Sequence, residues 1–188
     1  GTIVITFAAS KTNIQWVVVE ITSGFDSGTP ILQTQKMADE DGTGTSSTLT
    51  FGSGMASDSI VIAGYNDGSA GTMGPGTGYT ELVEVAGDPA TAVAHNASPD
   101  TTFDFSYTLG EQVGAIAVEV KATAGGASPT GNVLNSKVLR SLTQGRVFSM
   151  GYPIYYVPAG DVIPILFASY DKDDGSSVTL TGLAVTDT

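Results

Sequence analysis

Short segments in which apolar and polar residues alternate recur along the whole chain. This period of two is that of a β-strand, in which successive side chains point to opposite faces of a sheet. Two of the segments each place three large apolar side chains on one face: Ile3, Ile5 and Phe7 in the first, and Phe103, Phe105 and Tyr107 in the second. Glycine-rich turns separate the segments, and the 188 residues include 24 glycines. Many short strands joined by such turns predict an all-β fold, a jelly-roll-like antiparallel β-sandwich.

The alternation also predicts where the individual strands lie. The expected strands span residues 2–7, 14–21, 47–51, 59–65, 79–85, 91–95, 102–108, 113–121, 146–150, 154–157, 162–170 and 178–185. The segment 135–142 is the one place where a short helix is expected. Charged residues make up only 14% of the chain, so Ser, Thr, Gly, Asn and Gln must cover much of the surface.

Residues 2–21 and 102–120 resemble one another. Each segment reads as a hairpin made of an alternating strand, a polar turn and a β-branched strand. The second strands end in Val-Glu-Ile and Val-Glu-Val, so Glu20 corresponds to Glu119. The apolar faces of both strands agree, whereas a slip of one residue would exchange the faces. This agreement predicts an internal repeat.

A weaker similarity links residues 56–68 to 159–175, since both have an acid before an apolar run, a Tyr near its end and an Asp-Gly turn. The two similarities together predict that the ends of the chain close on each other, with the first and last strands in one sheet. The expected organisation is a repeat-containing β-sandwich at 1–122, a Gly/Ser/Pro linker at 123–131 and a β-rich segment at 132–188. This last segment completes a second lobe with the N-terminal strands.

The chain is strongly acidic and contains no cysteine. Seven basic and nineteen acidic residues give a net charge of −12. This balance excludes the basic surface that binds nucleic acid or an anionic membrane. No apolar stretch reaches the ~20 residues of a membrane-spanning helix, and without cysteine neither disulfides nor thiolate zinc sites can form. We expect neither nucleic acid nor membrane as a partner.

Six motifs follow one another within roughly residues 2–122: IQWVVVEITSGFDSGTPI, SDSIVIAGYNDG, GPGTGYTELVE, TAVAH, TTFDFSYT and VGAIAVEVKA. This series resembles a β-sandwich module of tailed-phage structural proteins, of the capsid-decoration or tail-fibre type. The resemblance implies a structural protein at the virion surface or outside the cell. Its implied partners are other virion proteins or copies of itself in a homo-oligomer. The resemblance supplies no catalytic residue.

No arrangement of residues in the sequence indicates catalysis. His95 is the single histidine, and no G-x-S-x-G motif accompanies it. Glu20 and Glu119 are expected to be solvated on outward strand faces. Glu81 and Glu84, three residues apart in one strand, are expected on opposite faces, so neither pair forms the facing carboxylates of a glycosidase. We therefore predict a protein that is not an enzyme and binds no catalytic cofactor.

The acidic turn at 171–175 has a composition that suits a structural calcium ion. Asp171, Asp173 and Asp174 supply the carboxylates that calcium prefers on a turning loop. The spacing departs from the D-x-D-x-D-G pattern, and no later Glu completes the loop. A solvated acidic turn is the alternative interpretation.

Four aromatic residues are candidates for a glycan platform or a protein interface: Trp16, Tyr152, Tyr155 and Tyr156. Their alternative is packing in the core. The sequence therefore leads to two hypotheses. The first is a non-enzymatic virion structural protein on the outside of a phage capsid or tail. The second is an adhesin that binds a host-surface glycan, or an extracellular surface β-sandwich module.

Overall fold

The structure is a computed structural model that describes most of the first two thirds of the chain and parts of the last third. The described residues are 2–7, 15–21, 24–26, 28–39, 44–68, 71–87, 90–96, 98, 100–108, 112–123, 137–140, 154–155, 163–169 and 180–186. For 2–7, 137–140, 154–155 and 180–186 it describes the backbone. Within 15–21 and 163–169 the described side chains are Gln15, Val17, Val19, Ile21 and Ile165.

The described part of the chain contains strands and no helix, which confirms the all-β prediction. The strands are β1 (Thr2–Phe7), β2 (Gln15–Ile21), β3 (Ile31–Asp39), β4 (Ser46–Thr50), β5 (Ile60–Asp67), β6 (Met73–Pro75), β7 (Thr80–Val85), β8 (Ala90–Asn96), β9 (Thr102–Tyr107), β10 (Val113–Val120), β11 (Lys137–Arg140), β12 (Ile154–Tyr155), β13 (Ile163–Ser169) and β14 (Leu180–Thr186).

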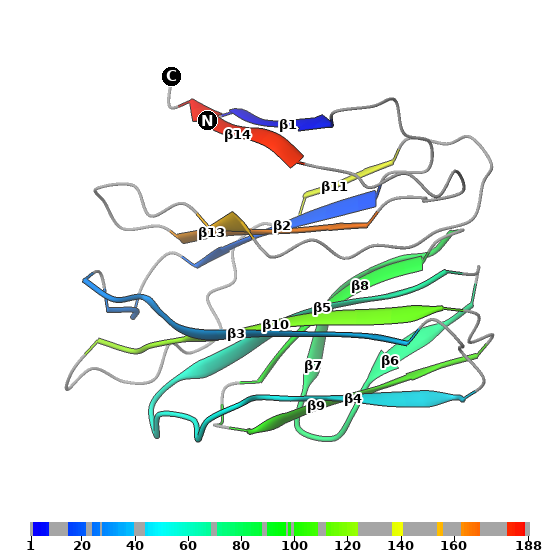
Figure 1. The fold of residues 1–188 in the computed structure, drawn as a ribbon, viewed down its shortest axis with the longest axis horizontal. Helices are drawn as coiled ribbons and strands as arrows, with labels where there is room; N and C mark the ends of the chain where they lie inside the picture. Colours follow the sequence, from blue (N-terminus) through cyan, green and yellow to red (C-terminus); the bar gives the residue numbers. More distant parts are fainter. Residues whose placement is uncertain are drawn as a thin grey trace.

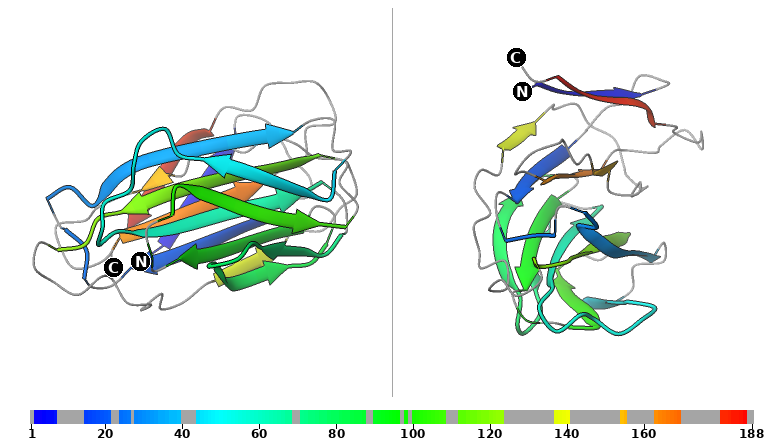
Figure 2. Two further views of the ribbon diagram at one scale, coloured as in Figure 1. Left: turned by 90° about the horizontal axis from the view of Figure 1, so that it is seen from below. Right: turned by 90° about the vertical axis from the view of Figure 1, so that its left-hand side faces the viewer.

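These strands form four sheets, and every pairing within them is antiparallel. The three-stranded sheet has the order β4-β9-β6, and the five-stranded sheet the order β3-β10-β5-β8-β7. The four-stranded sheet has the order β11-β2-β13-β12, and β1 and β14 form a two-stranded sheet. Figure 1 shows the sheets stacked as layers, from the three-stranded sheet at the bottom through the five-stranded and four-stranded sheets to the two-stranded sheet at the top. Figure 2 shows the same stacking from two other sides. Packed antiparallel sheets confirm the sandwich.

The first core lies between the three-stranded and five-stranded sheets. Phe103, Phe105 and Tyr107 of β9 point into it and are buried, while Asp104 and Ser106 are exposed. The predicted apolar face of this strand is therefore confirmed. The rings of Phe103 and Phe105 stack with centroids 5.5 Å apart, a favourable offset for aromatic pairs.

The second core lies between the five-stranded and four-stranded sheets. Val17 and Val19 of β2 and Ile165 of β13 pack there with residues of the five-stranded sheet, among them Ile62 and Val118. The five-stranded sheet is thus covered on both faces, and every residue of β5 and β10 is buried. Burial on both faces explains why these two strands read as nearly continuous apolar runs.

Three segments differ from the sequence prediction. The expected helix at 135–142 is wrong, because Lys137–Arg140 forms strand β11 and pairs with β2. Long-range pairing overrides a weak local helical tendency. Strands β3 and β6 are not predicted. In β3, polar residues such as Gln33 and Gln35 stand on the inward side, so the apolar alternation is faint. In β6, only three residues pair, and Pro75 ends the strand.

The two similar segments are not hairpins, contrary to expectation. β9 belongs to the three-stranded sheet and β10 to the five-stranded sheet, so the turn between them crosses from one layer to the next. β1 and β2 also belong to different sheets. Stacked sheets lie about 10 Å apart, a distance that a turn of several residues spans easily.

The first and last strands share a sheet, as expected from the sequence. β1 pairs with β14 so that Thr2 lies opposite Thr186, and both termini lie on the same side of the molecule (Figure 1). Strand pairing also relates the similar segments in the same way. Glu119 lies opposite Val61, and Glu20, which corresponds to Glu119, lies opposite Pro164. Val61 and Pro164 occupy equivalent positions in the similar segments 56–68 and 159–175. The internal repeat, the jelly-roll description and the domain boundaries stay predictions.

Candidate interaction surface

The residues predicted to bind calcium or a glycan are largely outside what the structure describes. Asp171, Asp173 and Asp174 lie outside the described residues, as do Tyr152 and Tyr156. Both hypotheses about these sites stay predictions.

The other two aromatic candidates are placed by their backbone alone. Trp16 is in β2 and Tyr155 is in β12, and their side chains are outside the described part of the structure. The two strands belong to one sheet, in which β13 lies between them.

His95 is a half-buried residue of β8. It lies opposite Ile62 on one side and Thr80 on the other. Burial lowers the pKa of its imidazole, which favours the neutral form at pH 7. Among the residues that the structure describes, no three His, Asp or Glu side chains gather to hold a metal ion.

Glu119 is buried, so the expectation that it is solvated is wrong. Its side chain is 1% exposed. Glu119 Oε1 accepts hydrogen bonds from the Ser59 hydroxyl at 2.7 Å and from the Ala56 amide at 2.8 Å. Glu119 Oε2 accepts one from Gln33 Nε2 at 2.7 Å. These three donors replace water around the carboxylate. Gln33 links β3 to β10, and Ser59 and Ala56 link the segment before β5 to β10.

Glu81 and Glu84 share one face of β7, so the expectation that they lie on opposite faces is wrong. A β-bulge between Glu81 and Val83 adds a residue to this strand. Glu81 therefore lies opposite Ala94 and Glu84 opposite Ala92, two residues on the same side of β8.

Because of this bulge, the carboxylates of Glu81 and Glu84 both lie near the buried hydroxyl of Tyr65. Burial and the charge of Glu84 raise the pKa of Glu81, which accepts a hydrogen bond from the Tyr65 hydroxyl at 3.3 Å. Burial and the same two carboxylates raise the pKa of Tyr65. The β7 edge of the five-stranded sheet is therefore bulged and acidic, two features that discourage another strand from pairing there.

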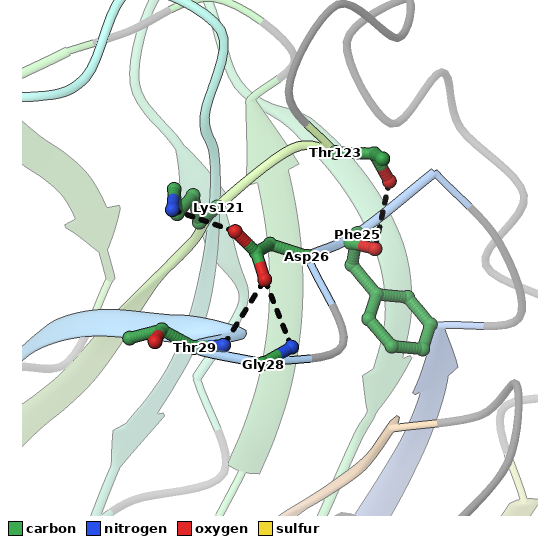
Figure 3. A network of polar contacts seen from close by, with 6 residues as sticks. All are labelled: Phe25, Asp26, Gly28, Thr29, Lys121 and Thr123. Carbon is green, nitrogen blue, oxygen red and sulfur yellow. Dashed lines mark hydrogen bonds and ion pairs between the residues drawn. The ribbon is translucent and has the colours of Figure 1, made fainter.

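The turn before β3 is fastened to the end of β10 (Figure 3). Asp26 Oδ1 accepts hydrogen bonds from the amides of Gly28 at 2.8 Å and Thr29 at 3.1 Å, and Asp26 Oδ2 binds Lys121 Nζ at 2.6 Å. The hydrogen bond from Lys121 and those from the two amides lower the pKa of Asp26 to about 2. The Thr123 hydroxyl donates to the Phe25 carbonyl at 2.8 Å.

Backbone contacts continue this connection to Pro30, the residue before β3. The Asp26 amide donates to the Lys121 carbonyl, and the Lys121 amide donates to the Pro30 carbonyl, both at 2.9 Å. Gly24 has a φ of 78°, a conformation that glycine adopts without strain. The GFDSGTP motif thus fixes where β3 begins.

β3 forms the other edge of the five-stranded sheet, opposite β7. It is nine residues long, the longest strand in the described part of the chain. It pairs with β10 on one side and with no described strand on the other. Figure 2 shows it running along one side of the molecule. An open edge of this length is a template on which another strand can pair.

The open side of β3 carries the backbone groups of alternate residues. The Lys36 amide donates to the Gln35 side chain at 3.2 Å, so it points away from β10. In an antiparallel strand the direction of these groups alternates, so those of Thr34 and Ala38 point the same way. The side chains of these residues are exposed. The sequence analysis does not predict this surface, although the turn-like segments 22–30 and 41–44 leave a gap of about ten residues that a strand can fill.

The comparisons with known proteins identify no relative. No protein-family model matches the chain, and neither a curated protein nor a solved structure matches it. Within the described residues, no helix is long and apolar enough to cross a membrane.

Proposed function

We propose that the protein is a non-enzymatic structural protein of a tailed-phage particle, displayed on the outside of the capsid or tail. It assembles with other virion proteins or with copies of itself through its sheet surfaces. The observation that carries this proposal is the nine-residue edge strand β3, which no second described strand pairs with, on a sheet that is covered on both faces. The motifs within residues 2–122 supply the phage setting.

The polar contacts around the sheet support the same function. The hydrogen bond from Gln33 to the buried carboxylate of Glu119 links β3 to β10, and the salt bridge between Asp26 and Lys121 links the turn before β3 to the residue after β10. Exposed Ser and Thr residues on β4, together with a net charge of −12, suit a protein that is solvated outside a cell.

Labelling of phage particles tests this function. An antibody raised against the recombinant chain is applied to tailed particles purified from the culture that supplies the sequence. Gold label on the outside of capsids or tails supports the proposal. Label confined to the cell envelope, with particles unlabelled, contradicts it. In that case, binding to a defined sugar on a glycan array that is lost in Tyr155→Ala supports the adhesin instead.

A further inference from the structure

We propose that two copies of this chain pair edge to edge through β3, antiparallel, about a two-fold axis at Gln35. The proposal rests on the proposed function, because it names the surface that the assembly uses. Five strands from each copy then form one continuous sheet. A two-fold contact of this kind uses the same strand of both copies and closes on itself.

The backbone N–H and C=O groups of β3 that point away from β10 determine where the two-fold axis lies. With the axis at Gln35, Thr34 of each copy lies opposite Lys36 of the other. Both residues have outward groups, so these two pairs can form about four interchain hydrogen bonds, two of which require the Lys36 amide to exchange its Gln35 acceptor for the Thr34 carbonyl of the second copy. With the axis at Lys36, the two lysines lie opposite one another, and like charges in that position are destabilising. With the axis at Thr34, Pro30 lies opposite Ala38 and donates no hydrogen bond.

The side chains of β3 fit the same register. Leu32 is 40% exposed and is the exposed large hydrophobic residue among those described. The axis at Gln35 places it opposite Ala38 of the second copy, where the small side chain leaves room for it. Pairing therefore removes this apolar surface from water, which is favourable.

Charge favours the β3 edge over the β7 edge. Two copies that each carry −12 repel one another. β3 contains one basic and one acidic residue, Lys36 and Asp39, so the edge itself is balanced. The β7 edge carries Glu81 and Glu84 and a bulge. Because the repulsion between whole copies is screened by salt, pairing through β3 should become tighter as the salt concentration rises.

A proline substitution on the open edge tests the pairing. Thr34→Pro removes one outward N–H from each copy and places a ring where the second strand must approach. Thr34→Ala removes the same side chain and keeps the N–H, so it is the matched control. By sedimentation equilibrium, we expect a dimer for the natural chain and for Thr34→Ala. We expect dissociation at least about tenfold easier for Thr34→Pro. A monomeric natural chain, or equal affinities for all three, would overturn the proposal.

A cross-link provides a second test that does not depend on how Thr34→Pro folds. The chain has no cysteine, so a single substitution introduces the only thiol. At the proposed axis the two Gln35 Cα atoms are about 4.5 Å apart, within the range of a disulfide. The two Thr34 Cα atoms are about 8 Å apart, beyond that range. We expect Gln35→Cys to form a covalent dimer under mild oxidation and Thr34→Cys to remain monomeric on a denaturing gel. Equal cross-linking of both, or none for Gln35→Cys, contradicts the register.

The two proposals fail in different ways. If the antibody labels the particles but Gln35→Cys forms no cross-link, the virion function stands and pairing through β3 is wrong. If Gln35→Cys forms a cross-linked dimer but the antibody leaves the particles unlabelled, the pairing stands and the virion function is wrong.

Discussion

Gln33 on β3 donates a 2.7 Å hydrogen bond to Glu119 on β10, although 86 residues separate the two in the sequence. The Glu119 carboxylate is buried and also binds Ser59 and Ala56. The strand that we propose as the contact between copies is therefore fastened at one end by a buried carboxylate. The same end is fastened again by the Asp26–Lys121 salt bridge.

Removal of this carboxylate should destabilise the fold. Glu119→Ala removes an acceptor that one buried and two part-buried donors share, so we expect the free energy of unfolding to fall by about 1–3 kcal/mol. Glu119→Gln keeps one acceptor oxygen and should cost less. Urea denaturation measures both. Thr34→Ala, at an exposed position of the same sheet, should stay within about 0.5 kcal/mol of the natural chain. Similar losses for Glu119→Ala and Thr34→Ala would show that the carboxylate does not stabilise the edge.

The turn before β3 should loosen in acid. The pKa of Asp26 is lowered from its ordinary 3.8 to about 2, so its contribution is complete above pH 3.8 and is lost as the pH falls through about 2. In NMR spectra, the amide signals of Gly28 and Thr29 should titrate with a midpoint near this lower value. Asp26→Asn should abolish the titration, whereas Asp104→Asn should leave it unchanged. A midpoint at the ordinary value would contradict the network in Figure 3.

The acidic edge at β7 should show the opposite dependence on pH. The pKa of Glu81 is raised, so its ionised form is disfavoured in the folded chain, and stability falls as the pH rises from 4.5 through the raised value. Glu81→Gln should therefore raise the free energy of unfolding at pH 7, by no more than about 0.5 kcal/mol because solvent screens the charges, and urea denaturation measures this change. At pH 3 it should have no effect. Glu84→Gln is the control, since it should lower the pKa of Glu81. A loss of stability in Glu81→Gln at pH 7 would contradict the coupling.

A close backbone approach at Gly76 should exclude any side chain. A Cβ atom there would lie 2.8 Å from both Cβ and the carbonyl oxygen of Asp104. The Gly76 amide also donates to that oxygen at 2.6 Å. We expect Gly76→Ala to cost about 1–3 kcal/mol in urea denaturation. Gly52→Ala is the matched control, because nothing lies within 4 Å of its added methyl group. Equal stability of the two variants would show that β6 moves freely over β9.

Alternation predicts best the strands that have one apolar face and one polar face. β9 is the clearest example, because Phe103 and Phe105 are buried while Asp104 is exposed. β3 is not predicted, because its inward residues include Gln33, whose partner is the buried Glu119. A polar residue that is satisfied by a distant carboxylate looks like a solvated one in the sequence. Because the sequence does not predict β3, it does not predict the proposed interaction surface that β3 forms.

The sequence by itself determined that this chain forms antiparallel β-strands, where most of them lie and which face of β9 is apolar. These properties follow from the local alternation of side chains. Only the tertiary structure decided that β9 and β10 belong to different sheets, that β5 and β10 are covered on both faces, and that β3 is an edge strand with no second partner among the described strands. Hydrogen-bonded partners and the stacking of layers join residues far apart in the chain, and a local period carries no information about them.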